Sequence, residues 1–271
     1  MKILALLLFL LVSSTAQAAP KSELWDYWQA NDANSTVVVD HSSWDDLLAR
    51  YVQEGSGAKS GIALFQYAAV SAADLKTLRQ YLQQLAEVPV RQLSRAEQQA
   101  YWINLYNALT VEVILSNYPL ASIRDISSGF FSSGPWGEKR FQVDGENVSL
   151  DEIEHRILRP IWQDARLHYA VNCASIGCPN LAASAYTADN TDELLAAGAV
   201  AYVNHSRGAV VADGELTVSS IYDWFQEDFG GNEAGVIEHL KQYAEDNLAE
   251  QLAQVTTVAN YQYDWSLNEV K

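Results

Sequence analysis

The chain has 271 residues, of which 34 are acidic and 17 basic, so its formal net charge is −17. Hydrophobic residues make up 49% and charged residues 19%, which excludes a disordered acidic tail and predicts a chain that buries a core. The acidity argues against nucleic acid as a partner, because phosphate binding requires a basic surface, and against docking on anionic lipid.

Residues 1–18 have the pattern of a secretory signal peptide. Lys2 is followed by an apolar run that is too short to span a bilayer about 30 Å thick, and then by Ala-Gln-Ala at residues 16–18. We therefore expect cleavage before Ala19 and a periplasmic or secreted protein, with no membrane insertion after cleavage. Residues 19–271 are expected to form a single globular domain.

Helix signals dominate the chain. Serine residues followed three positions later by an acid open several amphipathic stretches, and proline or glycine closes them. We expect helices over residues 44–52, 72–85, 96–115, 151–159, 192–204, 221–229 and 235–252.

Strand signals are fewer and mostly form hairpins with Asp-Gly turns. They cover residues 62–67, 139–150, 166–173, 208–218 and 260–267. The sum predicts a helix-rich α+β single domain with a small, mainly antiparallel sheet.

The two cysteines, Cys173 and Cys178, lie close together in NCASIGCPN. In an oxidising compartment they favour a disulfide, although so short a loop would stabilise the fold only weakly. Alternatively, Cys173 is a thiolate nucleophile at a strand end, under backbone amides. Both interpretations stay open.

His155 is the preferred base for Cys173. It lies on a short acidic helix where Glu154 or Glu152 can orient the ring, although an ion-paired surface histidine gives the same pattern. If residues 166–173 form a strand, His168 is about 16 Å from Cys173, at roughly 3.3 Å per residue, and on the opposite face. His168 then supports the site and does not act as the base. If the strand ends early and doubles back, His168 becomes the preferred base.

Asn104 and Asn107 share one face of the long, apolar helix over residues 96–115. Buried amides need partners. These two either face a substrate, where they stabilise an oxyanion, or tie the helix to a loop backbone.

Cofactors and metals are not indicated. The chain has no closed Cys/His spacing for zinc and no nucleotide-binding motif, so we expect neither. The acids of YDWFQEDFGGNEAG leave calcium open but lack the ligand pattern of an EF-hand.

Four blocks in order, YWINLYNALTVEVIL, SLDEIEHRILRP, DARLHYAVNCASIGCPNL and IYDWFQEDFGG, resemble the domain of unknown function 547 family. The family's members look like exported bacterial proteins and plant proteins that add a leucine-zipper segment, and this chain has no such heptad segment. The positions matching the family's blocks are Asn104, Asn107, Glu154, His155, Arg166, His168, Cys173, Cys178 and Pro179.

The family is similar to papain-like and transglutaminase-like thiol hydrolases in having a Cys and upstream His residues. Because His precedes Cys here, that similarity implies a permuted arrangement.

The sequence supports two hypotheses about function. The first is an exported cysteine hydrolase or acyltransferase that acts on a peptide-like amide, with Cys173, His155 and Glu154 as its catalytic group. The second is a non-catalytic envelope module with a structural disulfide and an aromatic groove, lined partly by residues 129–137.

Overall fold

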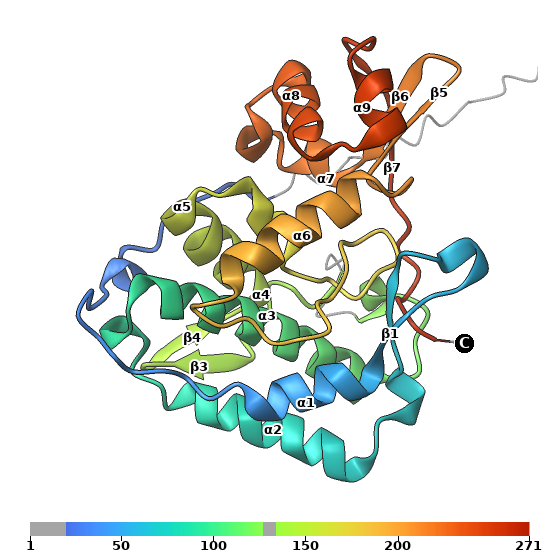
Figure 1. Ribbon diagram of the computed structural model, residues 1–271. Helices are drawn as coiled ribbons and strands as arrows, with labels where there is room; N and C mark the ends of the chain where they lie inside the picture. Colours follow the sequence, from blue (N-terminus) through green and yellow to red (C-terminus); the bar gives the residue numbers. More distant parts are fainter. Residues whose placement is uncertain (1–19, 127–133, 271) are drawn as a thin grey trace, which may run out of the picture.

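The computed structural model describes residues 20–126 and 134–270. The predicted signal peptide and most of the aromatic loop over residues 129–137 lie outside these ranges. Helices carry most of the regular structure (Figure 1). The α-helices are α1 (Ser42–Tyr51), α2 (Ala72–Ala86), α3 (Arg95–Asn117), α4 (Leu150–Glu152), α5 (Arg159–Trp162), α6 (Thr191–Val203), α7 (Ile221–Trp224), α8 (Glu233–Tyr243) and α9 (Asp246–Leu252).

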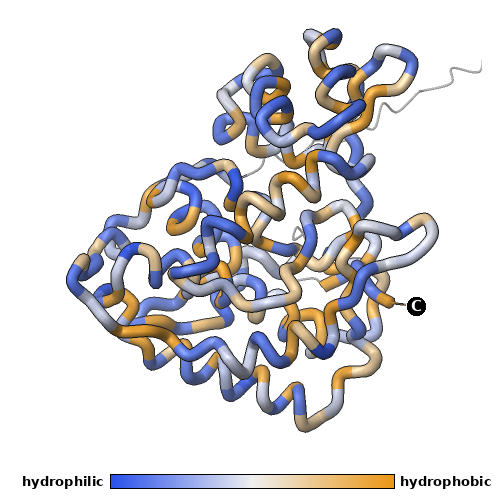
Figure 2. Tube along the Cα trace, in the orientation of Figure 1, coloured by the Kyte–Doolittle hydropathy of each residue, from blue (hydrophilic) through white to orange (hydrophobic). Residues whose placement is uncertain are grey.

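Helix α3 is the centre of the larger hydrophobic cluster. The Ser94 side chain caps its start by accepting from the Glu97 amide, and the chain leaves the helix before Pro119, where a helix cannot continue. Nearly every residue from Ala100 to Ile114 is buried. Helices α1 and α2 alternate between hydrophobic and hydrophilic stretches, as expected of helices with one buried face (Figure 2).

In residues 20–126 and 134–270 the strands form three small sheets and not the single sheet expected. Two are antiparallel hairpins, and in the third β6 pairs antiparallel with β5 and parallel with β7. The helix-rich α+β class is therefore confirmed, with the strands distributed around the helices. Their bounds are β1 (Val52–Glu54), β2 (Ala63–Phe65), β3 (Phe141–Val143), β4 (Glu146–Val148), β5 (Ala209–Ala212), β6 (Glu215–Ser219) and β7 (Val258–Gln262).

Helix α6 joins two hydrophobic clusters. Leu195 near its start packs into the α3 cluster, whereas Tyr202 near its end packs with β5, β6, α7, α8 and α9. Figure 1 shows α6 crossing between these two parts of the molecule. Among the described residues, no helix combines the length and the apolarity needed to cross a membrane.

The strand predicted over residues 166–173 is wrong. Ala165–Tyr169 forms a 3-10 helix, capped by the Asp164 side chain, which accepts from the Arg166 amide. The β-forming residues made this stretch resemble a strand, but no neighbouring strand pairs with it. Local capping and burial of Leu167 and Tyr169 decide its conformation instead. Consequently His168 does not point away along an extended strand.

Candidate functional site

The cysteine loop, residues 170–180, is held on one side by asparagines. Asn107 donates to the Ala170 carbonyl and accepts from the Asn172 amide, both at 2.8 Å. Asn104 makes the same pair of bonds with the backbone of Tyr186, at 2.8 and 3.0 Å. The two amides predicted on this helix face are therefore bonded to loop backbone, as in the structural interpretation.

The other side of the loop pairs with residues 264–268. The Ile176 amide donates to the Ser266 carbonyl and the Gly177 amide to the Asp264 carbonyl, both at 2.8 Å. A Cβ at Gly177 would lie only 2.8 Å from the Asp264 nitrogen, so this close approach requires glycine. The Cys173 sulfur is thus placed by three separated parts of the chain.

The thiol centre consists of Cys173, Ser175, Cys178 and Tyr263. The Cys173 sulfur lies 3.1 Å from the Ser175 hydroxyl and 3.1 Å from the Tyr263 hydroxyl. These two hydroxyls are 2.9 Å apart. The hydrogen bond from Cys178 lowers the pKa of the Cys173 thiol most, and Ser175 and Tyr263 lower it further, against burial and the charge of Glu154.

Both cysteines are free thiols. The Cys173 amide donates to the Cys178 sulfur at 3.0 Å, and burial raises the pKa of Cys178 well above its ordinary value. Of the two thiols, Cys173 is therefore the one that loses its proton more readily. The residue after Cys173, Ala174, has φ +60°, a left-handed conformation that a non-glycine residue adopts only under local constraint.

His155 belongs to a separate imidazole network, which consists of Glu154, His155, Arg159, His168 and Asp228. Arg159 donates to His155 Nδ1 at 3.1 Å, so that nitrogen is the acceptor of a neutral ring. The Nε2 atom of His155 lies 3.8 Å from Asp151. Burial is the main cause that lowers the His155 pKa to about 4.

His168 and Asp228 complete this network. The Nε2 atom of His168 lies 2.6 Å from Asp228 Oδ2, which also accepts from Arg159 at 2.5 Å. Burial alone would raise the Asp228 pKa, but the hydrogen bonds from His168 and Arg159 outweigh it and lower that pKa to about 2. Glu154 lies between the rings, with its Oε1 3.9 Å from His155 Nδ1 and 3.8 Å from His168 Nδ1.

A π-helical segment, Ile153–Leu158, carries Glu154 and His155. Such bulges are frequent at functional sites. At position 160 a residue other than proline would donate its N–H to the His155 carbonyl in π-helical geometry, or to the Arg156 carbonyl in α-helical geometry. Pro160 has no N–H and donates to neither.

The N-terminal strap, residues 20–25, satisfies those two carbonyls. The Glu23 amide donates to His155 and the Trp25 amide to Arg156, both at 3.0 Å. The Pro20 carbonyl accepts from Arg159 at 2.9 Å, which helps to bury the guanidinium.

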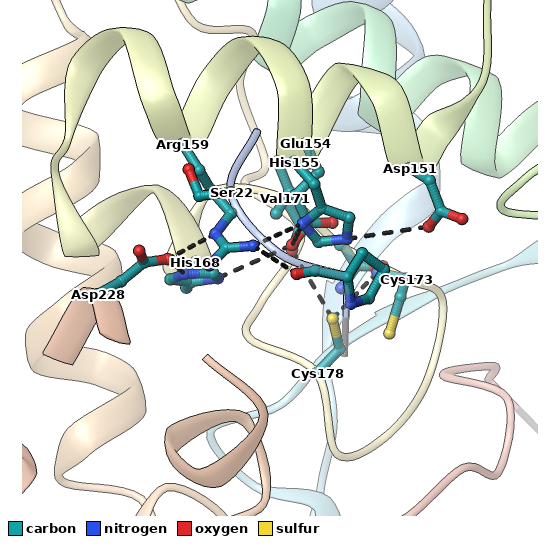
Figure 3. A network of polar contacts seen from close by, with 12 residues as sticks. Ser22, Asp151, Glu154, His155, Arg159, His168, Val171, Cys173, Cys178 and Asp228 are labelled. Carbon is teal, nitrogen blue, oxygen red and sulfur yellow. Dashed lines mark hydrogen bonds and ion pairs between the residues drawn. The ribbon is translucent and has the colours of Figure 1, made fainter. Parts of the chain in front are cut away.

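The predicted Cys–His pair is not joined by a hydrogen bond. Figure 3 shows the network running from Asp151 through His155 and Arg159 to Asp228, while the bonds drawn to Cys178 join it to Cys173 and Val171 of the cysteine loop. His155 and Glu154 lie together as expected, and His168 joins them because its segment is helical. The extended strand on which the predicted separation of His168 from Cys173 depended is therefore absent.

Sequence reasoning missed four residues of these clusters: Ser175, Arg159, Asp228 and Tyr263. Asp228 was visible only as one of several acids and Tyr263 only as part of an alternating strand pattern. Their bonds span 60 or more residues of sequence, from His168 to Asp228 and from Cys173 to Tyr263. No local sequence spacing could therefore indicate Asp228 or Tyr263.

Residues 90–203 match the model of a family described as "Protein of unknown function, DUF547". This part of the chain is a DUF547 domain. The DUF547 match includes both asparagines, the π-helix, His168 and both cysteines, but ends before Asp228 and Tyr263. No curated protein and no solved structure matches the chain. The permuted papain-like or transglutaminase-like arrangement therefore stays a prediction.

Proposed function

We propose that this DUF547 protein is an exported cysteine-dependent hydrolase or acyltransferase that acts on a peptide-like amide through Cys173. The observation that carries the proposal is the arrangement of donors around one sulfur. Cys173 is free, only partly buried, and in contact with two hydroxyls and a thiol that favour its thiolate. Export rests on the leader-like sequence of residues 1–18.

In the proposed reaction Cys173 reacts as a thiolate, whose proton has passed to solvent water, and the sulfur attacks the amide carbonyl carbon. The C–S bond forms, the C–N bond breaks, and the leaving amine takes a proton from water. Attack of water or of a second amine on the thioester then regenerates the thiol. Ser175 and Tyr263 stabilise the thiolate by donating hydrogen bonds to the sulfur, and His155 takes no part in this step because its acceptor nitrogen is already bonded to Arg159.

The test uses p-nitrophenyl acetate as a generic acyl donor. The wild type is expected to release a burst of nitrophenol and to carry one acetyl group on Cys173, found by peptide mass spectrometry. Cys173→Ser should lose the burst, whereas Cys178→Ser should keep an acyl group on Cys173. Acetylation elsewhere with none at Cys173, or a burst that survives in Cys173→Ser, would overturn the proposal.

The non-catalytic envelope module remains the alternative hypothesis. Its structural disulfide has no counterpart here, since both thiols are free. An aromatic surface does lie beside the thiol centre.

A further inference from the structure

Four aromatic side chains adjoin the thiol centre and form what we call the aromatic wall: Trp136, Trp224, Tyr263 and Trp265. Tyr263 is the inner member, with ring centroids 4.6 Å from Trp265 and 4.8 Å from Trp224. Trp224 and Trp265 stack at 5.5 Å and Trp136 meets Trp265 edge-on at 5.8 Å. Residues far apart in sequence therefore gather their rings at one place.

The wall is only half-buried, unlike the tryptophans of the core. Trp28, Trp44 and Trp102 are each about 1% exposed, whereas all four wall residues retain intermediate exposure. Aromatic surface left accessible in a cluster is typical of a ligand-binding site. Here the cluster ends at the Tyr263 hydroxyl, 3.1 Å from the Cys173 sulfur.

A positive charge lies over the outer part of the wall. The exposed Arg124 guanidinium is 5.1 Å from the Trp265 ring centroid and forms no ion pair with any residue in the described ranges. The chain as a whole carries a formal charge of −17, so this cation is a local site of attraction in a molecule that otherwise repels anions.

We propose that the aromatic wall is the acyl-group subsite of the Cys173 centre and takes a ring-bearing acyl group with a carboxylate. The inference rests on the proposed function and names its substrate class. The ring of the acyl group packs on Trp224 and Trp265, and its carboxylate pairs with Arg124, while the scissile carbonyl lies at Cys173. Aromatic packing supplies affinity and Arg124 selects anionic over cationic groups.

Alkylation of Cys173 tests this without requiring turnover. Iodoacetamide, N-benzyl iodoacetamide and 4-(iodoacetamidomethyl)benzoate are compared, each rate at Cys173 divided by the rate with free cysteine. The benzyl reagent is expected to exceed iodoacetamide by about tenfold and the benzoate by more, on the basis of about 1.4 kcal/mol for a tenfold change. Equal normalised rates for the three reagents would overturn the subsite.

Variants locate the effect. In Trp265→Ala the benzyl preference should fall to about one, whereas Trp162→Ala, a half-buried tryptophan outside the wall, should keep it. Arg124→Gln should lose only the benzoate preference and keep the benzyl preference. Because Arg124 is on the surface, Arg124→Gln tests the subsite even if Trp265→Ala does not fold. An unchanged benzoate preference in Arg124→Gln would contradict the role of Arg124.

A second probe separates this inference from the proposed function. If Cys173 does not react with iodoacetamide, the proposal that Cys173 is a nucleophile fails. The aromatic subsite can then still be tested by measuring the binding of a ligand. Hippurate, which has a ring, an amide and a carboxylate, should quench indole fluorescence saturably in the wild type and less in Trp265→Phe. The absence of saturable quenching would overturn the subsite by itself.

Discussion

Thiol enzymes combine a thiol with an imidazole, and here the thiol lies in the thiol centre and the imidazoles lie in the imidazole network. The two clusters differ in how far these groups are already engaged by neighbouring side chains. In the network each imidazole is engaged: His155 accepts from Arg159, and His168 bonds Asp228. The thiol centre contains neutral hydroxyls and a partly accessible sulfur. Both histidine rings are buried, whereas the Cys173 sulfur is partly exposed, which favours Cys173 as the group that meets a substrate.

Phe225 and Trp224 connect the two regions. The Phe225 ring stacks on His168 at 4.5 Å, and Trp224 next to it belongs to the aromatic wall. The charge of Glu154 also acts on Cys173, where it raises the thiol pKa. Within the described residues, the two regions are thus coupled through packing and charge and not through a hydrogen bond.

The largest effect is expected from Arg159→Met. The substitution leaves Asp228 and Glu227 without their buried cation, and loss of one partner of a buried ion pair costs about 3–5 kcal/mol of unfolding free energy. Urea denaturation measures this loss. Arg79→Met, which removes a half-exposed ion pair with Glu112, is the matched control and should cost far less. Similar losses in both would contradict a tightly held network.

The second effect is a pH dependence that His155 confers on stability. Its folded pKa of about 4 lies below the unfolded value of 6.5, so unfolding takes up a proton, and stability is lost as pH falls from about 6.5 towards 4. At pH 5 this amounts to about 2 kcal/mol.

The test compares the change in unfolding free energy between pH 7.5 and pH 5 in the wild type and in His155→Gln. The variant should lose about 2 kcal/mol less over this interval. His41 and His239, whose pKa values burial also lowers to about 4, contribute the same slope to both proteins and cancel. An identical drop would show that the pKa of His155 is the same in the folded and the unfolded protein, which contradicts the lowered pKa.

The smallest effect is expected from Pro160→Ala. The new N–H can donate to the carbonyl of His155 or Arg156, where it competes with the strap amides of Glu23 and Trp25. Hydrogen exchange of these two amides should become about threefold to tenfold faster, which corresponds to roughly 1 kcal/mol of local opening. Pro89→Ala, outside this helix, is the control. Unchanged exchange would mean that the strap does not depend on the missing donor.

The sequence predicted the helices well because caps and apolar spacing are local signals. Ser71 and Ser94 cap α2 and α3 as expected, and both Asp-Gly hairpins form. It failed for residues 166–173, where β-forming residues and the inside-outside alternation suggested a strand that had no partner. The helix expected over 235–252 is also divided, since Ala244 is extended.

The site was predictable only in part. Cys173, His155 and Glu154 were identified because they lie within two short motifs of one matching segment. Their separation was not predictable, because it depends on Asp228 and Tyr263, whose contacts with His168 and Cys173 arise from the packing of distant segments. Motifs therefore indicated the reactive groups, and only the fold separated them into two centres.

The most direct test of the central claim is the pH dependence of Cys173 alkylation by iodoacetamide in the wild type, Tyr263→Phe and His168→Gln. The account predicts a thiol pKa below that of free cysteine in the wild type. That pKa should rise by about one unit in Tyr263→Phe, which removes a hydrogen bond to the thiolate, and should change little in His168→Gln. A thiol pKa that moves with His168 and not with Tyr263 would contradict the account.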